Sequence, residues 1–454
     1  MSEFLPWKIE HLALRKPLPS LNAEAGCGGL FVVFWCDDFP VGQLMIPGPL
    51  LPITPAQLAT LAAPRVAKAV GDRIFAGNFR DSPPDHSQAH TINHAAGLAQ
   101  LLELKDPLET FSRGMRPSSS VDSDSAASTV SVVICTRDRP EALKKCLASL
   151  RSLAPRPDEI LVVDNDPSSG VTPAVTALFP EVRCVSESRP GLSAARNTGI
   201  RSTSGKIIAF TDDDVTVHPR WIGAIRKVLD NPDIIASTGL VLPAELMTRA
   251  QFAFQGNGLG WDMGYQPIDF DRNFFRNTLR EGVPVWRIGA GANMAFRREV
   301  FSRIGFFDER LGAGAAGCSE DSELWYRILA EGHRCRYDPE AVVFHTHRSD
   351  ANGLSEQAFS YMRGHVSALL FQFDRYKHWG NIYRAFVVLP GHFMTLFYRS
   401  LKLSVARTLV DPEKESFEPP LGPQIRGFFA GFAHYFRHRH LRTDPIVPRT
   451  SRPA

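Results

Sequence analysis

The chain has 454 residues, enough for two or three domains, and its 44% hydrophobic and 22% charged residues are typical of a soluble globular protein. The formal net charge of +3 argues against a general polyanion binder, so we expect no nucleic-acid partner. The seven cysteines are odd in number and include no C-x-x-C pair, which indicates a reducing compartment without a disulfide framework or zinc ribbon. The N-terminal residues contain no continuous apolar core and therefore predict no signal peptide.

The first part of the chain, residues 1–112, has the size of a small α+β domain. The segment "GLFVVFWCDDFPVGQLMI" predicts two strands around a turn at Asp37 to Pro40, and "TPAQLATLAAPRVAKAV" predicts a helix with Pro55 at its first position. No catalytic constellation is present, so the role of this domain stays open. Residues 113–129 are rich in serine and poor in large apolar residues, which predicts a linker.

The pattern then changes to an alternation of strands and helices across residues 130–350. The apolar runs "SVVICT", "DEILVVDND", "VRCVSES" and "KIIAFTDDD" are separated by three segments with helical periodicity. Such alternation predicts an α/β fold with a mostly parallel, doubly wound sheet and helices on both faces. Ligands of such sheets bind at the carboxyl ends of the strands, where Thr136, Asp164 and the triplet Asp212 to Asp214 are expected.

The aspartate triplet admits three interpretations. Carboxylates at a strand end are hard oxygen ligands for Mg²⁺ or Mn²⁺, and a cation would relieve their mutual repulsion. Alternatively, Asp is common where strands end, and the triplet is then a solvated turn. Asp212-x-Asp214-x-Thr216 also fits the pattern of haloacid-dehalogenase-type phosphatases, in which Asp212 would attack phosphate and Asp214 would be the acid/base.

A second acidic site follows residue 285. Gly289 and Gly291 are expected to let the backbone approach a ligand closely, and the helix "REVFSRIG" then ends at Gly305. The segment "SEDSELWYRILAEG" predicts another helix with Ser319 at its N-cap, so that Glu320 and Asp321 lie in its first turn. These carboxylates either stabilise the helix dipole or supply a general base.

Together these segments resemble a glycosyltransferase family 2 domain of the GT-A fold. The resemblance rests on "SVVICTRDRPEALKKCLASL", "ILVVDND", "RPGLSAARNTGI", "FTDDD", "GAGANMAFRREVFSRIGFFDE" and "SEDSELWYRILAEG", which occur in the family's order and cover about half of the chain. It implies transfer of a sugar from a nucleoside-diphosphate sugar to an acceptor hydroxyl, with inversion at the anomeric carbon. It leaves the donor sugar, the base and the acceptor open. A non-catalytic sugar-nucleotide-binding protein is a further alternative. The aspartate triplet expected on the donor side and the "ED" pair expected to supply the base are both intact, which argues against it.

The resemblance also implies roles for individual residues. Asp214 would contact a divalent cation, Mn²⁺ or Mg²⁺, most directly, while Asp212 would contact it and lie nearer the ribose. Asp321 matches the general base and Glu320 is its neighbour. Contacts to the donor nucleotide or its diphosphate would come from Thr136, Arg137, Asp164, Arg196, Asp212 and Asp213, although strand alternation would point Asp213 away.

Two histidines follow the last predicted strand in "AVVFHTHRSD". Some family members place a metal-binding histidine at a similar distance past the "ED" pair, and His345 is the better match. Because alternation along a strand would point both rings to one face, His347 is the second choice. Trp286 and Trp325 would either stack on an acceptor sugar or pack in the core.

The C-terminal region, residues 351–454, is basic and aromatic, with 14 Lys and Arg against 7 Asp and Glu. Its helical segments would either lie on a membrane surface, where a lipid-linked glycan acceptor for polysaccharide synthesis would be found, or pack on the catalytic domain and form a dimer interface. The longest apolar stretch is too short and too interrupted to cross a membrane. A cytoplasmic enzyme, peripheral on the cytoplasmic face, is the expectation, with the oligomeric state open.

Overall fold

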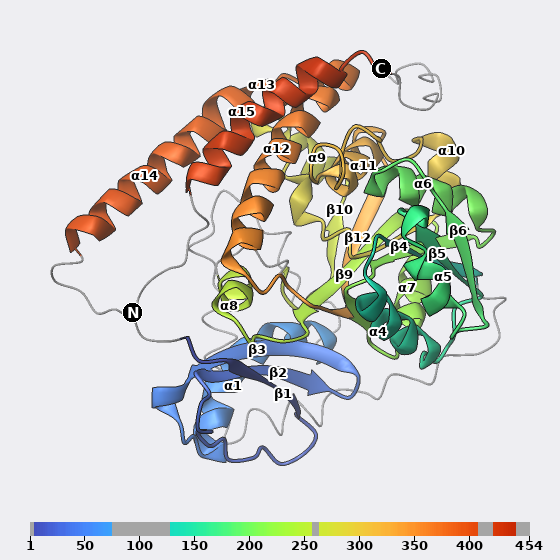
Figure 1. Ribbon diagram of the computed structural model, residues 1–454. Helices are drawn as coiled ribbons and strands as arrows, with labels where there is room; N and C mark the ends of the chain where they lie inside the picture. Colours follow the sequence, from blue (N-terminus) through green and yellow to red (C-terminus); the bar gives the residue numbers. More distant parts are fainter. Residues whose placement is uncertain (1–3, 75–127, 257–262, 407–420, 442–454) are drawn as a thin grey trace.

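The computed structural model describes residues 4–74, 128–256, 263–406 and 421–441, so the predicted linker lies almost entirely outside the described part (Figure 1). The described part of the N-terminal unit, residues 4–74, contains a three-stranded sheet and the helix α1. Its elements are β1 (Trp7–Ala13), β2 (Gly29–Cys36), β3 (Phe39–Pro47) and α1 (Pro55–Ile74). β1 is parallel to β2 and β3 is antiparallel to it, with Asp37 in the left-handed region at the turn. The predicted strand pair, turn and helix are thereby confirmed.

The first half of the large sheet follows the predicted alternation. The strands β4 (Val130–Thr136), β5 (Glu159–Asp164), β6 (Val182–Ser186) and β7 (Ile207–Asp212) are all parallel neighbours in the order β7-β4-β5-β6. Between them come the helices α4 (Pro140–Arg151), α5 (Val171–Thr176) and α6 (Leu192–Ser202). β4 and β5 are continuous apolar runs because the sheet is covered on both faces.

The second half makes the sheet mixed. Its strands are β8 (Val215–Val217), β9 (Ile234–Pro243), β10 (Ile268–Phe270), β11 (Asn293–Arg297) and β12 (Arg334–His345). Its helices are α7 (Trp221–Leu229), α8 (Arg249–Gly256), α9 (Arg272–Thr278), α10 (Glu299–Arg303) and α11 (Glu320–Ala330). The strand order is β10-β12-β9-β11-β7-β4-β5-β6, and β11 runs antiparallel between β7 and β9. The expected parallel pairing therefore holds for the first four strands and for β9 with β12, while β8, β10 and β11 run antiparallel to their neighbours. The α/β class with covering helices holds for the whole sheet.

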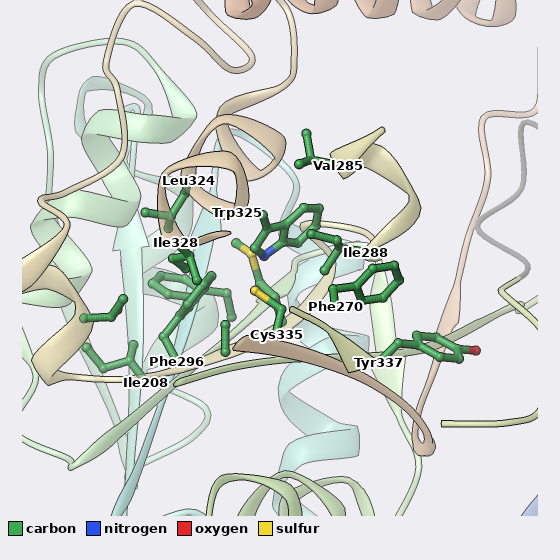
Figure 2. Close-up of a cluster of buried hydrophobic side chains, with 14 of the residues drawn as sticks. Ile208, Phe270, Val285, Ile288, Phe296, Leu324, Trp325, Ile328, Cys335 and Tyr337 are labelled. Atoms are coloured by element: carbon green, nitrogen blue, oxygen red, sulfur yellow. The ribbon is translucent and has the colours of Figure 1, made fainter. Parts of the chain in front are cut away.

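Two hydrophobic clusters cover the faces of this sheet. Figure 2 shows part of one of them, in which Trp325 of α11 packs with Phe296 and Cys335. Trp325 has no exposed surface, so of the two roles considered for it core packing applies. Phe31 and Trp35 of β2 belong to the same cluster, and the N-terminal sheet is thus packed onto the large one rather than standing apart.

The C-terminal region is helical, as expected. It contains α12 (Ala351–Tyr376), α13 (Trp379–Tyr383), a π-helical turn (Arg384–Val388), α14 (Leu389–Ala406) and α15 (Leu421–His438). Gly427 and Gly431 let α15 approach α12 closely, because a Cβ at either would meet the backbone oxygen of Phe359 or Arg363 within 3 Å. Figure 1 shows α14 extending away from the body of the molecule. Among the helices described, none is both long and apolar enough to span a membrane.

Candidate active site

A cavity of about 1050 Å³ opens at the carboxyl ends of β4 and β7 and reaches the C-terminal helices. It brings together nearly all of the residues that the sequence singles out. The predicted residues that line it are Thr136, Arg137, Arg196, Asp212, Asp213, Asp214, Glu320, Asp321 and His345. Asp164 does not line it, although its neighbour Asn165 does.

The aspartate triplet is held by arginines as well as by its strand. Arg139, in the loop after β4, donates from Nη1 to Asp213 Oδ1 at 3.0 Å and to Asp214 Oδ2 at 2.9 Å. Asp213 is buried and also accepts from the Thr136 hydroxyl at 2.7 Å, so both of its oxygens are used by the protein. Burial raises the pKa of Asp213 to about 6, against the opposing effect of Arg139. Asp213 therefore fixes the end of β4 to the end of β7, which fits a side chain turned away from the ligand.

Arg196 of α6 connects the two acidic sites. It is 2% exposed, and its guanidinium donates to Glu320 Oε1 at 2.5 Å and to Asp212 Oδ1 at 3.3 Å. The same Nη2 also reaches the carbonyl oxygen of Gly291 at 3.3 Å. Burial raises the pKa of Asp212 while Arg196 opposes the shift, which is the balance expected for a carboxylate beside a buried cation. Sequence reasoning placed Arg196 near the diphosphate; the structure adds that it joins the triplet to the "ED" pair.

Asp321 lies at the start of α11 and is half-buried. Burial and the adjacent Glu320 raise the pKa of Asp321 to about 7, in the range that suits a general base at neutral pH. Its Oδ1 accepts from the Ser322 backbone N–H at 2.6 Å, and its Oδ2 lies against Gly291. A Cβ at Gly291 would come within 3.0 Å of Arg196 and 3.1 Å of Asp321, so this glycine makes room for the two charged side chains.

Asp214 and His345 form the best candidate for a cation site. His345 Nε2 is 3.3 Å from Asp214 Oδ1, and this buried oxygen accepts no hydrogen bond from any residue the structure describes. His345 Nδ1 contacts His347 Nδ1 at 2.9 Å, and His347 in turn contacts Gln255 at 3.3 Å. Burial lowers the pKa of His347 to about 3, so it is a neutral ring that orients His345.

The donor set fits a divalent cation, since a buried carboxylate oxygen and an imidazole nitrogen face each other at 3.3 Å. Within the described ranges, however, no three Asp, Glu, His or Cys side chains already converge as a metal cluster. Asp212, which the sequence predicted as a metal ligand together with Asp214 and His345, instead accepts a hydrogen bond from Arg196. A bound cation would have to compete for that carboxylate or take its remaining ligands from a substrate.

At the side of the site where the sequence predicts nucleotide binding, fewer of the polar atoms are paired within the protein. Asp164 is buried, its Oδ1 accepts from the Asp166 backbone N–H at 3.1 Å, and its Oδ2 has no hydrogen-bond partner among the described residues. Such an unsatisfied carboxylate oxygen is what a ribose hydroxyl or a base N–H would satisfy. Arg137 is exposed and lies 3.5 Å from Asp166. Asn165 holds the loop before α6, donating to the carbonyls of Glu187 and Arg189.

One local expectation needs correction, and the structure adds detail to two others. Ser319 occupies the N-cap position of α11 but has φ +72° and makes no capping hydrogen bond, so it is a turn residue. Gly289 and Gly291 line the cavity, but what requires them is contact with the protein itself, since a Cβ at Gly289 would meet Thr238 at 2.5 Å. Trp286 is partly exposed and lines the cavity, unlike Trp325.

Sequence reasoning missed two groups of cavity residues. The first is Arg139, whose place in "CTRDRP", three residues after Thr136, was the available signal. The second comes from the far end of the cavity and carries no motif. It consists of Arg287, Tyr361, His365, Arg384 and His392.

Residues 131–305 match the profile of the family described as "Glycosyl transferase family 2". A similar protein is the glucosyl-dolichyl phosphate glucuronosyltransferase of Haloferax volcanii, 27% identical over 229 residues, which are 48% of this chain and 68% of that protein. Another is the pre-mycofactocin glycosyltransferase of Mycobacterium tuberculosis, 25% identical over 225 residues, 48% of this chain and 43% of that protein. The chain thus spans less than half the length of the mycobacterial relative.

Among solved structures, the mannosyltransferase PcManGT from Pyrobaculum calidifontis in complex with GDP-Man and Mn²⁺ aligns with a TM-score of 0.45 and 19% identity, covering 68% of this chain and 87% of that one.

Proposed function

The chain is a glycosyltransferase that belongs to family 2 through residues 131–305, and from this premise we propose that it transfers a sugar from a nucleoside-diphosphate sugar to an acceptor hydroxyl by direct displacement with inversion. The observation that supports the proposal best is the link made by Arg196. It joins Asp212 of the triplet to Glu320, the neighbour of Asp321, inside one cavity. A leaving-group site and a base on either side of one reacting carbon are what a single displacement needs.

In this proposal Asp321 is the general base. Its raised pKa, about 7, lets it accept a proton from the acceptor hydroxyl while the hydroxyl attacks the anomeric carbon. Arg196 keeps Glu320 paired, so that the second carboxylate does not itself take the proton. Gly291 leaves space beside Asp321 Oδ2, where the acceptor oxygen would lie.

The donor side would be held by the strand ends. Asp164 Oδ2 would accept a hydrogen bond from the nucleoside, and Asp212 would lie toward the ribose. Asp214 and His345 would hold a divalent cation, Mn²⁺ or Mg²⁺, which as a Lewis acid would stabilise the diphosphate leaving group. Arg139 holds Asp214 and Asp213 in position from the opposite side.

The phosphatase alternative is not favoured. Its motif needs Asp212 as a free nucleophile on the first strand of its domain, whereas β7 is the fourth strand of the large sheet and Asp212 accepts from Arg196. The family match points the same way. A non-catalytic sugar-nucleotide-binding protein would bind the donor equally well, and only turnover separates it from the enzyme.

We also propose that the enzyme acts at the cytoplasmic surface of a membrane, in the synthesis of a polysaccharide or lipid-linked glycan. The support is the exposed apolar surface of α14, where Met394 is 73% and Phe397 is 62% exposed. A dimer interface would use the same surface. Sedimentation with anionic vesicles, compared for the full chain and for Met394→Ser/Phe397→Ser, tests the proposal: equal binding of both would contradict it, as would a dimer that dissociates in the variant.

The central proposal is tested by ligand-dependent thermal stability. We expect one of the nucleoside diphosphates UDP, GDP, ADP, CDP and dTDP to raise the midpoint of unfolding in the presence of Mn²⁺ and much less in EDTA. The same nucleotide should then appear as product when its sugar conjugates are offered with candidate acceptors. Phosphate release with a phosphorylated Asp212 would instead identify a phosphatase, and no stabilisation by any nucleotide would contradict the proposal.

A further inference from the structure

The cavity has a second end, at which the catalytic domain meets the C-terminal helices. There the 3₁₀ turn Val285–Arg287 faces α12 and the π-helical turn Arg384–Val388. The acidic residues that line the cavity are Asp212, Asp213, Asp214, Glu320 and Asp321, and all of them belong to the end already described. The far end is lined instead by cationic and aromatic side chains, so the two ends have opposite electrostatic character.

Arg384 is held firmly at this end. Its Cζ lies 4.2 Å from the centroid of Trp286, its Nε is 3.4 Å from His365 Nε2, and its Nη1 donates to the carbonyl of Glu281 at 3.3 Å. Trp286 is also packed edge-on against His365, with ring centroids 5.0 Å apart. These contacts fix the direction of the guanidinium without neutralising its charge.

Arg287 adds a second positive charge. Its side chain is exposed, lines the cavity and makes no hydrogen bond or ion pair with the part of the chain that the structure describes. It is close enough to Arg384 that burial together with Arg287 lowers the pKa of Arg384 to about 10, with exposed Glu281 acting in the opposite sense. Two like charges that face one cavity repel each other unless an anion is bound between them.

An apolar surface begins beside these arginines. Val388 and Leu389, which follow Arg384 by four and five residues, also line the cavity, and on the same turn Phe386 and Val387 are exposed. The surface continues along α14 to Met394. A ligand bound at the arginines would therefore have an aqueous acidic cavity on one side and exposed hydrocarbon side chains on the other.

We propose that Arg287 and Arg384 bind the phosphate of a lipid-linked acceptor, whose hydrocarbon chain lies along the exposed residues of the π-helical turn and α14, and whose sugar extends past Trp286 toward Asp321. The proposal rests on the glycosyltransferase function and specifies the class of its acceptor. A planar guanidinium pair matches phosphate geometry. The adjoining apolar surface has no use for a water-soluble sugar phosphate, and this distinguishes the two sources of a phosphate group.

The test measures binding of farnesyl phosphate to the full chain in EDTA, with farnesol, geranyl phosphate and glucose 1-phosphate as comparison ligands. Arg287→Gln removes a charge without breaking a described contact, and it should weaken the affinity for farnesyl phosphate about tenfold. The matched control is Arg280→Gln, an exposed arginine on the neighbouring 3₁₀ turn that does not line the cavity. Arg280→Gln should leave the affinity for farnesyl phosphate unchanged. Neither substitution should change the affinity for farnesol, which has no phosphate. Geranyl phosphate, with its shorter hydrocarbon chain, should bind more weakly than farnesyl phosphate.

Equal affinities of Arg287→Gln and Arg280→Gln would overturn the assignment, because the phosphate would then be bound elsewhere, for instance at the donor end. Equal affinities for farnesyl phosphate and glucose 1-phosphate would overturn the lipid-linked class in favour of a soluble phosphorylated acceptor. Binding of a nucleoside diphosphate with Mn²⁺ is measured on the same samples. If it is absent from the wild type the proposed function fails, whereas if it is intact in Arg287→Gln any loss belongs to the acceptor subsite.

Discussion

The two ends of the cavity differ in the residues that line them and in the elements that carry those residues. At the donor end, the carboxylates of Asp212 to Asp214 lie at the end of β7, and those of Glu320 and Asp321 lie at the start of α11. The partly exposed Arg139 pairs with Asp213 and Asp214, and the buried Arg196 pairs with Asp212 and Glu320. At the helical end, Arg287 and Arg384 lie on short helical turns among partly exposed aromatic rings. The first end is a compact network in which each charge depends on another, and the second is a looser surface that borders solvent.

This difference predicts different consequences of mutation. At the donor end, loss of one member leaves a buried charge without its partner, and both chemistry and folding should suffer. At the helical end, loss of Arg287 should alter acceptor binding alone, because its side chain supports nothing else that the structure describes. Each of the following experiments tests whether the donor end is as interdependent as its contacts indicate.

The largest effect is expected for Asp321→Asn. If Asp321 is the general base, turnover should fall about 10²–10⁴-fold while nucleotide binding is retained, since the amide cannot accept the proton. The measurement is kcat with the natural donor, alongside calorimetric nucleotide affinity. Glu299→Gln, which removes an exposed carboxylate paired with Arg303 on α10, serves as the control and should be fully active. Wild-type turnover in Asp321→Asn would contradict the assignment.

The next effect concerns stability. Arg196→Met should lower the free energy of unfolding by about 3–5 kcal/mol, the usual cost of leaving buried carboxylates without their cation. Arg201→Met, on the exposed face of the same helix α6, where Arg201 lies over the ring of Phe306, should cost about 1 kcal/mol or less. Denaturant unfolding of the two variants provides the comparison. If both cost the same, Arg196 does not hold the donor end together.

Much of the donor end could be predicted from sequence because its signals are local. Apolar runs that end in polar residues were sufficient to predict β4, β5 and β7. In a parallel sheet the carboxyl ends of such strands lie together, so the site could be predicted without placing the intervening loops. The same reasoning could not place β11, because its antiparallel position between β7 and β9 depends on pairing between segments far apart in sequence. β8 and β10 are likewise antiparallel to β12, so these two strands and β11 together make the sheet mixed.

The helical end could not be predicted because it has no motif. Arg287 and Arg384 are about a hundred residues apart, and only the packing of α12 and the following turn against residues 285–287 brings them to one cavity. Arg139 is an intermediate case, near enough to Thr136 to be considered but attached to Asp213 and Asp214 by a contact that alternation does not encode. Trp325 and Trp286 differ in how far they are buried, and a single sequence carries no direct signal of burial that would have told their roles apart.

Metal binding gives a smaller effect. Asp214→Asn should weaken the affinity for Mn²⁺ about 10–100-fold, and His345→Ala should weaken it as well, because Asp214 Oδ1 and His345 Nε2 are the atoms that face each other. Manganese affinity is measured directly by electron paramagnetic resonance in the presence of the nucleotide. His333→Ala, a histidine remote from the cavity lining, should bind Mn²⁺ as the wild type does. Unchanged affinity in both site variants would exclude this pair as ligands.

The smallest effect is a pH dependence whose sign differs between activity and stability. Because burial and Glu320 raise the pKa of Asp321 to about 7, kcat/KM should rise about tenfold between pH 6 and pH 8 as this base loses its proton. For stability the direction reverses: an unfolded Asp titrates near pH 4, so between there and pH 7 the folded chain binds more protons and the contribution of this group falls as pH rises. Asp321→Asn should remove this contribution to stability. An activity limb centred near pH 4 would mean that Asp321 is solvated like an ordinary surface carboxylate, and the donor end would then be no more interdependent than the helical end.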